Sequence, residues 1–398
     1  MREHMTVAAT LPEDGAAGAL AGRIWRPDVH GPAIISVRED GLYDITQYAP
    51  TLSALADADN ILSITQYSKA ERVGELADIL ANTPAADRDP LQPWLLSPID
   101  LQAVKAADAT FAGPILEQTI IKLSETAPDK AEALQTQINA LFGEKLRDVV
   151  PGSPEAQSLK STLIEQAAWS PELEVCIGED AQIFTKAQPM ATVGHGMEAD
   201  LDPRSAWNHS EPEVVLIISS AGQIVGVTLG NDVSLRDFTD RSALLLSQAK
   251  ESRASAAIGP FVRFFDNFFS LETVQRMNVK LNIKGQDRFE LETSFSMSQM
   301  TRDPKTLVAN IMEKTYPYPD GVAFYLGTGF IPTEDRGEDG AGFTHRPGDI
   351  TIVSTPALGS LANIITVSDQ AEPWTFGAGA LMHNLSGRGL LKPTQRDK

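Results

Sequence analysis

Short runs rich in Val, Ile and Leu recur along the chain and are bounded by Gly, Pro, Asn and Ser. Such runs predict β-strands, because branched side chains fit a pleated sheet and the bounding residues favour turns. The expected strands lie at residues 22–25, 33–37, 41–45, 214–218, 224–229, 279–283, 322–326, 350–353 and 363–367. The pattern therefore predicts a protein dominated by β-structure.

Helical periodicity is concentrated in one long segment. From about residue 115 to 169, apolar residues recur three or four positions apart, as at Leu159 and Leu163. Shorter helices are expected at residues 70–82, 242–250 and 304–315. A Pro-rich passage near residue 95 marks a domain boundary. We expect an α+β fold with a small β-rich N-terminal domain, 1–95, and a larger domain, 96–398, with a helical insertion at about 115–169.

Two stretches of the chain carry no charge and are long enough to be mistaken for membrane spans: residues 214–231 and 351–368. Each contains turn residues at its centre and is rich in Val, Ile and Thr. This favours pairs of strands joined by turns and predicts no membrane partner. The first ten residues lack the apolar core of a signal peptide.

The charge balance narrows the choice of partners. The chain has 33 Lys and Arg against 53 Asp and Glu, a formal net charge of −20. Such a field repels a phosphate backbone, so we expect no nucleic-acid partner. The single cysteine, Cys176, excludes an intramolecular disulfide and a thiolate zinc cluster. A reducing, cytoplasmic location is expected.

The chemistry is concentrated at the start of one apolar strand. Glu211 and Glu213 are two residues apart, so their side chains point to the same face of a sheet. Like charges side by side are unfavourable unless a cation lies between them. The alternative is a solvated strand end with ordinary surface acids.

The following strand ends in Asp232, which the hairpin brings back to the same place. With a turn centred between Ser220 and Ala221, Gly230 is expected opposite Glu211. Asp232 is then the diagonal neighbour of Glu211 on the same face. Three carboxylates with open positions suit Mg²⁺ or Mn²⁺ rather than zinc or copper.

Two basic residues follow these acids. Arg236 and Lys250 could place positive charge beside a metal for an anionic substrate. The alternative is an ordinary turn arginine and a lysine at a helix C-terminus, where the helix dipole favours it.

The spacing of these residues resembles the fumarylacetoacetate hydrolase superfamily. The shared segments are Glu211-x-Glu213, residues 230–237, Ala249-Lys250, Ile258-Gly259-Pro260, Phe184-x-Lys186, Pro347-Gly348-Asp349 and Gly359-x-Leu361-x-Asn363. The resemblance implies a mixed β-sheet roll and Mg²⁺, with Mn²⁺ possible, held by Glu211, Glu213 and Asp232. It also implies Lys250 as a catalytic residue and a homodimer or homotetramer.

Further segments resemble one branch of that family, the 2-keto-3-deoxy-D-xylonate and 2-keto-3-deoxy-D-arabinonate dehydratases. They include residues 97–102, 207–208, 241–247, 373–377 and 384–391. This implies a hydro-lyase that converts a 2-keto-3-deoxy sugar acid to 2,5-dioxopentanoate in non-phosphorylative pentose oxidation.

One departure from the family pattern bears on the reaction. Hydrolases of the family often carry Asn-Tyr-x-x-His-x-x-Glu, whose histidine activates water, but Pro114 stands at the histidine position here and Glu117 at the glutamate position. This favours elimination over hydrolysis of a 2,4-diketo acid, which remains the alternative. A non-catalytic sugar-acid binding module is the second alternative.

Either Lys250, with a pKa lowered by metal and burial, or Glu117 is the expected base, and the other assists departure of the hydroxyl.

Three residues are expected to contact the substrate. Lys186 and Arg236 are predicted to position its anionic end, and Thr355 to donate a hydrogen bond to its carboxylate.

Overall fold

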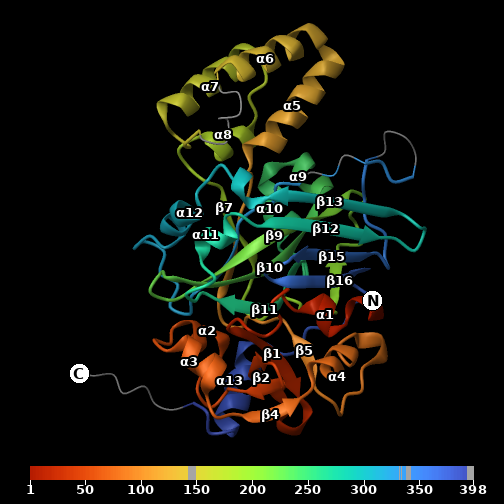
Figure 1. Ribbon diagram of the computed structural model, residues 1–398. Coiled ribbons are helices and arrows are strands. Elements are labelled where there is room, and N and C mark those ends of the chain that lie inside the picture. Colours follow the sequence, from red (N-terminus) through yellow and green to blue (C-terminus); the bar gives the residue numbers. More distant parts are fainter. Residues whose placement is uncertain (142–148, 331, 333, 338–341, 392–398) are drawn as a thin grey trace.

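The computed structural model describes residues 1–141, 149–330, 332, 334–337 and 342–391 (Figure 1). The strands are β1 Leu20–Arg26, β2 Gly31–Arg38, β3 Gly41–Asp44, β4 Glu71–Gly74, β5 Trp94–Leu96, β6 Ala103–Ala107, β7 Ile183–Ala187, β8 Glu198–Leu201, β9 Asn208–Ile218, β10 Ile224–Leu235, β11 Ala256–Phe264, β12 Asn278–Lys284, β13 Glu290–Ser296, β14 Val322–Tyr325, β15 Ile350–Thr355 and β16 Gly359–Val367. The α-helices are α1 Val7–Thr10, α2 Leu52–Ala56, α3 Ile61–Tyr67, α4 Leu76–Ala81, α5 Ala112–Thr126, α6 Pro128–Leu141, α7 Pro154–Glu165, α8 Pro171–Ile177, α9 Arg236–Arg241, α10 Leu246–Lys250, α11 Leu271–Val274, α12 Pro304–Ile311 and α13 Ala378–Gly387.

One large sheet runs through the molecule in the order β4-β3-β2-β1-β11-β10-β9-β14-β6-β7, with β5 paired to β1. The strands of the N-terminal unit join the body through β1 and β11, where Leu20 is opposite Arg263. The expected boundary near residue 95 therefore falls between segments that share a sheet.

A second sheet, in the order β13-β12-β15-β16-β8, packs over the first (Figure 1). The core between them contains Val214 and Leu216 of β9, Val279 and Leu281 of β12, and Val353 of β15, all fully buried. Alternate residues of β9 face the other way, where Val215 and Ile217 join a separate core. The predicted α+β, strand-rich fold is confirmed.

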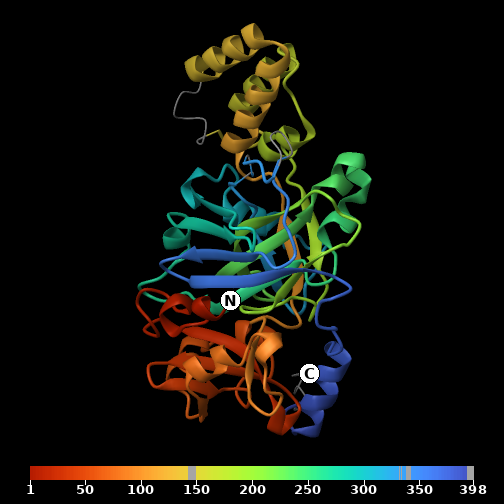
Figure 2. The same cartoon turned by 90° about the vertical axis from the view of Figure 1, so that its right-hand side faces the viewer.

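Helices α5 to α8 form the predicted helical insertion and stand at the end of the molecule remote from the N-terminal unit (Figures 1 and 2). Their apolar faces make a core of their own, which includes Leu116, Leu134, Leu159, Leu163 and Cys176. Residues 142–148 of this predicted segment lie outside the described residues.

The helix expected at residues 70–82 is wrong in its first half. Residues Glu71–Gly74 form strand β4, in which Leu42 of β3 is opposite Gly74. Helix α4 begins only at Leu76. Pairing at the open edge of the sheet outweighs local helical preference here, and such tertiary pairing cannot be read from a short window.

Both uncharged stretches form paired strands, β9 with β10 and β15 with β16, as predicted. Within the described part of the chain, no helix has the length and apolar character needed to cross a membrane.

The C-terminal helix α13 lies against the N-terminal unit (Figure 2). Asn384 Nδ2 donates to the carbonyl oxygen of Val29 at 2.8 Å, and Arg388 Nη1 donates to that of Pro32 at 2.8 Å. Helix α13 therefore packs on the N-terminal unit although it lies more than 300 residues later in the sequence.

Candidate metal centre

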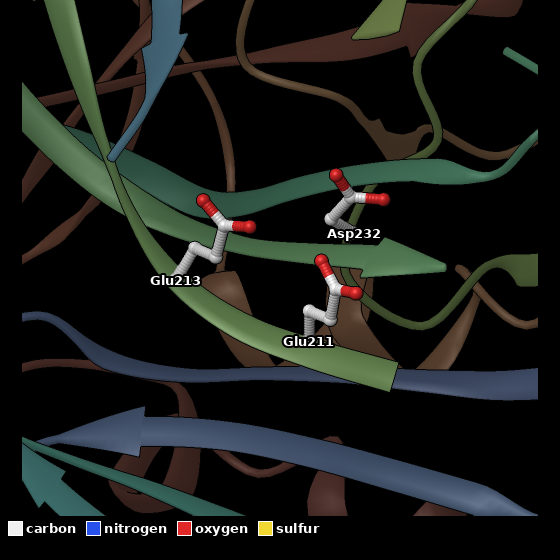
Figure 3. Close-up of side chains that lie close together, drawn as sticks. All are labelled: Glu211, Glu213 and Asp232. Atoms are coloured by element: carbon white, nitrogen blue, oxygen red, sulfur yellow. The ribbon is translucent and has the colours of Figure 1, made fainter. Parts of the chain in front are cut away.

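Three acidic side chains meet on one face of the β9–β10 hairpin (Figure 3). Glu211 and Glu213 come from β9, and Asp232 comes from β10 directly opposite Glu211. One carboxylate oxygen of each lies within 4.8 Å of the others, and all three residues are buried. The predicted convergence of these carboxylates is confirmed.

The register expected for this hairpin is wrong by two residues: Gly230 lies opposite Glu213, not Glu211. The turn closes with the N–H of Ser219 donating to the carbonyl oxygen of Gln223 at 2.9 Å, and the ladder is irregular just after the turn. The side-chain period of a strand is two, so a slip of two residues keeps every side chain on its face.

Glycine at position 230 makes room for an aromatic wall. A Cβ at this position would lie 2.4 Å from Cε1 of Tyr325, so a larger residue would displace the ring. Tyr325 is fully buried, and its hydroxyl donates to the carbonyl oxygen of Ala257 at 2.8 Å. The tyrosine therefore forms a fixed boundary beside the carboxylates.

Two buried lysines and a histidine surround the acids. Lys250 Nζ lies 2.5 Å from Glu211 Oε2 and 3.6 Å from Asp232 Oδ2. Lys186 Nζ lies 2.8 Å from Asp232 Oδ1. His209 Nε2 lies 3.0 Å from Glu211 Oε1. The structure thus brings Lys186 and Lys250 to the acids, as the sequence led us to expect.

Glu213 is the least compensated of the three carboxylates. Its Oε2 accepts the backbone N–H of Gly327 at 2.6 Å. Burial, the charge of Asp232 and that of Glu211 raise the pKa of Glu213 well above its ordinary value. Burial also raises the pKa of Glu211, but Lys250 and His209 outweigh it and leave that pKa below its ordinary value.

The protein's own groups move the pKa of Lys250 in the direction opposite to that expected from the sequence for a metal-bound site. Burial lowers it, but the charges of Asp232 and Glu211 outweigh burial and raise it above the ordinary value. The expectation counted burial and a bound metal and left out the charges of Asp232 and Glu211. In this arrangement Lys250 holds its proton.

These residues fit a divalent cation with oxygen ligands. Two lysines face three carboxylates, so negative charge remains uncompensated in a buried site. Both oxygens of Asp232 have ion-pair contacts with the lysines but accept no hydrogen bond from the residues that the structure describes. A carboxylate-only ligand set is the preference of Mg²⁺ and Mn²⁺ rather than of zinc or copper.

Lys186 does not have the position expected of a substrate-binding residue. It is fully buried, and its ammonium group donates to the carbonyl oxygen of Val233 at 3.1 Å, to that of Lys250, and to Ser255 Oγ at 3.0 Å. With the ion pair to Asp232, these contacts use all of its N–H groups. The structure places Lys186 in support of the carboxylate cluster, and the prediction of a direct substrate contact is corrected.

We expect Lys186→Met to destabilise the protein by about 3–5 kcal/mol, because it leaves Asp232 buried without its partner. Thermal or urea unfolding of the purified protein measures this. Lys284→Met, at a half-exposed lysine of β12, is the control and should change stability by less than about 1 kcal/mol. Equal stabilities of the two variants would contradict the supporting role of Lys186.

The other predicted site residues lie outside the carboxylate cluster. Arg236 begins α9 with its guanidinium 4.9 Å from the ring centroid of Trp207. Burial lowers the pKa of His209, and the charge of Arg236 acts in the same direction. Thr355 is buried at the end of β15, and no hydrogen bond within the described residues joins its side chain to the acids. The roles of Arg236 and Thr355 stay predictions.

Glu117 is exposed on helix α5, and its side chain forms no hydrogen bond or ion pair within the part of the chain that the structure describes. The segment directly before this helix nevertheless contacts a strand end next to the site. Thr110 Oγ1 donates to the carbonyl oxygen of Leu326 at 2.7 Å, directly before Gly327. The proximity of Glu117 to the reacting groups stays a prediction.

A serine–histidine–aspartate arrangement behind the site had escaped the sequence analysis. Ser210 Oγ lies 2.9 Å from His345 Nε2, and His345 Nδ1 lies 3.0 Å from Asp349 Oδ2. Arg336 also pairs with Asp349 at 2.5 Å. Burial opposes ionisation of Asp349, yet Arg336 and His345 lower its pKa to about 2. Ser210 is fully buried, and its side chain lies on the other face of β9 from that of Glu211. The network therefore holds the segment before β15 in place and does not present a nucleophile to the site.

Asp200 on β8 is a second buried carboxyl that the sequence analysis did not single out. Its Oδ2 accepts from Nε of Arg253 at 3.3 Å. Burial raises its pKa to about 6, although Arg253 acts in the opposite direction. The charged form of Asp200 therefore costs the folded protein stability near neutral pH.

We expect Asp200→Asn to stabilise the protein at pH 7.5 and to lose this advantage at acidic pH. An acid whose pKa is raised on folding stabilises the folded protein at pH values below its ordinary pKa. This contribution is lost as pH rises through the raised pKa, which is about 6 for Asp200. Asparagine cannot ionise, so the difference from wild type should grow across that range to about 1–2 kcal/mol, discounted for partial solvent screening. Melting temperatures of both proteins between pH 4.5 and 8 measure it. A difference independent of pH would contradict the raised pKa.

Together the fold and the acids define a class: a β-rich protein with a buried, carboxylate-lined site for a divalent cation. Residues 165–366, half of the chain, match the family described as fumarylacetoacetate (FAA) hydrolase C-terminal. The chain belongs to the fumarylacetoacetate hydrolase family. The resemblance inferred from the motifs is thereby confirmed.

Two curated relatives are named as dehydratases. The 2-dehydro-3-deoxy-D-arabinonate dehydratase of Saccharolobus solfataricus is 31% identical over 156 residues, which are 39% of this chain and 51% of that protein. The chain thus matches about half the length of this relative. A Haloferax volcanii protein with the name "Probable 2-keto-3-deoxyxylonate dehydratase" is 26% identical over 262 residues, 66% of this chain and 81% of that protein.

Solved structures confirm the family fold. A 2-keto-3-deoxy-D-arabinonate dehydratase complexed with magnesium and 2,5-dioxopentanoate superimposes with a TM-score of 0.59 at 18% identity, over 87% of this chain and 99% of that one. A 5-carboxymethyl-2-hydroxymuconate delta-isomerase from Mycobacterium smegmatis gives 0.51 at 17% identity, over 88% and 99%. The family scaffold therefore carries more than one named activity.

Proposed function

We propose that this protein is a Mg²⁺-dependent hydro-lyase that converts a 2-keto-3-deoxy pentonate to 2,5-dioxopentanoate. The observation that carries the proposal is the buried cluster of Glu211, Glu213 and Asp232 with Lys250 in contact with two of them. Mn²⁺ fits the same oxygen ligands. When bound, the cation supplies a Lewis acid for the negative charge that develops when a 2-keto acid loses a C3 proton, worth several kcal/mol.

The names of the two relatives support one substrate rather than two. D-xylonate and D-arabinonate differ at C2 and C3, and both stereocentres disappear in the 2-keto-3-deoxy acid. The two names therefore describe the same compound, whose remaining stereocentre is C4. We propose this compound, with the D configuration, as the substrate, in non-phosphorylative pentose oxidation.

The reaction needs one group that removes a proton and one that delivers a proton. Loss of a C3 proton and of the C4 hydroxyl as water leaves an unsaturated 2-keto alcohol. Transfer of a proton from C5 to C3, and of the C5 hydroxyl proton to C4, then gives the aldehyde. Because Glu211 and Asp232 hold Lys250 protonated, Nζ of Lys250 is the candidate that donates to the departing hydroxyl. Glu117 then remains the candidate base.

Arg236 and Thr355 are proposed to hold the anionic end of the substrate. Arg236 is half-buried, and burial together with its charge lowers the pKa of His209, which contacts Glu211. Thr355 lies on β15 of the second sheet, which packs against the other face of the hairpin, so its role is proposed from the sequence alone. A homodimer or homotetramer stays a prediction.

The test is to incubate the purified protein and Mg²⁺ with 2-keto-3-deoxy-D-pentonate and to follow the products by NMR. We expect 2,5-dioxopentanoate, with the L isomer turned over more slowly. Pyruvate together with a two-carbon aldehyde would indicate C–C cleavage and contradict the proposal. Saturable binding of the acid without turnover would indicate the non-catalytic binding module.

A 2,4-diketo acid such as an acylpyruvate tests the hydrolase alternative. Pro114 replaces the family's water-activating histidine and lies in the first turn of α5. We therefore expect hydrolysis at no more than a small fraction of the dehydration rate. If hydrolysis is faster than dehydration, the protein is a hydrolase of 2,4-diketo acids and the dehydratase becomes the alternative.

A further inference from the structure

A cavity of about 440 Å³ lies apart from the carboxylate cluster, between the N-terminal unit, the segment that follows Lys250 and residues 371–376. Trp25 and Trp94 stack in its wall with ring centroids 5.7 Å apart, and Phe376 meets Trp25 edge-on at 5.1 Å. Trp374, two-fifths exposed, also lines it. This volume and these aromatic walls are typical of small-molecule sites.

Two arginines line the same cavity, Arg253 with 31% of its side chain exposed and Arg23 almost fully buried, and each has one nitrogen without a hydrogen-bond partner among the described residues. Arg253 contacts Asp200 through Nε, while its Nη2 is buried without a hydrogen-bond partner in the described chain. Arg23 is buried, and its Nη1 donates to the carbonyl oxygen of Ser97 at 3.3 Å; its Nε lies 3.7 Å from a carboxylate oxygen of Asp100 and makes no hydrogen bond with the described residues. Unused guanidinium donors in a partly desolvated cavity favour an anionic ligand.

The acids that line the cavity are already engaged. Both oxygens of Glu372 accept from Nη1 of Arg88, at 2.8 and 2.9 Å, and Arg88 in turn lies over the ring of Trp94. Glu198 Oε2 accepts the backbone N–H of Glu372 at 2.9 Å. Repulsion of an incoming carboxylate is therefore reduced on this side of the cavity.

We propose that this cavity is a second ligand site, separate from the metal centre, and that it binds a small aromatic carboxylate. The ring packs against Trp25, Trp374 and Phe376, and the carboxylate meets the exposed part of the Arg253 guanidinium, whose Nε is held by Asp200. Aromatic pairs favour offset or edge-on contact, and a guanidinium matches a carboxylate with two parallel hydrogen bonds.

The experiment is calorimetric titration of the full chain with indole-3-acetate and, as an uncharged match, indole-3-acetamide. EDTA is present throughout, so that a metal-bound carboxylate does not contribute. We expect saturable binding of the acid at millimolar concentration or below, and binding of the amide that is about tenfold weaker or more. No saturable binding of the acid, or equal binding of acid and amide, would overturn the proposal.

Variants locate the site. Arg253→Met should weaken binding of indole-3-acetate about tenfold or more, and Trp374→Ala at least threefold. Arg204→Met, at an arginine whose side chain is 70% exposed, should leave binding unchanged. Glu213→Gln should also leave it unchanged, because that residue belongs to the metal centre. Melting curves verify that each variant is folded, and unaltered binding by folded Arg253→Met would refute the assignment.

Discussion

Glu213→Gln is expected to lower dehydration at least a thousandfold at saturating Mg²⁺. The substitution keeps the shape of the side chain but removes one of three anionic ligands, and with it most of the several kcal/mol that a Lewis acid contributes. Initial rates across a Mg²⁺ titration measure this loss, and EDTA should reduce the wild-type rate to a similar level. A variant with full activity, or wild-type activity in EDTA, would refute the metal-centre assignment.

The same variant should fold at least as well as wild type when EDTA is present. Burial and neighbouring acids raise the pKa of Glu213, so its contribution to stability is present below its ordinary pKa and is lost as pH rises through the raised value. Glutamine cannot ionise, so any stability advantage of the variant should grow with pH. Glu292→Gln, at an exposed glutamate of β13, is the matched control and should change neither activity nor stability.

Lys250→Met is expected to lower kcat about 10²- to 10⁴-fold, the usual range for loss of a group that transfers a proton. Unlike Glu213→Gln, it should leave Mg²⁺ affinity intact or increase it, because the ammonium group that competes for Glu211 and Asp232 is gone. Rates at saturating Mg²⁺ and calorimetric Mg²⁺ titration separate the two effects. A kcat within threefold of wild type would exclude Lys250 from proton transfer.

Stability gives an independent check on Lys250. Removing it leaves Glu211 buried without its closest cation, which typically costs about 3–5 kcal/mol. Added Mg²⁺ should restore much of this loss, since a ligand that binds the folded state stabilises it. Lys305→Met, on the exposed side of α12, is the control and should behave as wild type. A loss of stability that Mg²⁺ does not reduce would argue for a structural role of Lys250 alone.

The metal ligands could be predicted because they depend on a local rule. The error of two residues in the hairpin register was harmless, since the side chains of a strand return to the same face every second residue. Glu211, Glu213 and Asp232 therefore met despite the irregular ladder after the turn. The spacing of the acids in the family motif depends on the same two-residue period.

The roles of the surrounding residues depend on contacts between distant segments and could not be read from the sequence. Lys186 looked available for a substrate until three acceptors from beyond residue 230 surrounded it. Lys250 acquired a raised pKa only through the charges of Asp232 and Glu211, which two strands bring to it. The placement of Glu117 follows from how the helical insertion is oriented, which periodicity within one helix does not specify.

The pairing of β1 with β11 has a consequence for how the chain is made. Leu20 leaves the ribosome early, but its partner Arg263 follows only after more than half of the protein has been synthesised. Until then β5 can pair with Arg23 to Trp25, but Leu20 and Ala21 have no partner on that edge of β1, and α13, which contacts β2, comes later still. Such distant pairings slow folding, so the N-terminal strands are the part of a nascent chain most exposed to aggregation and most dependent on chaperones.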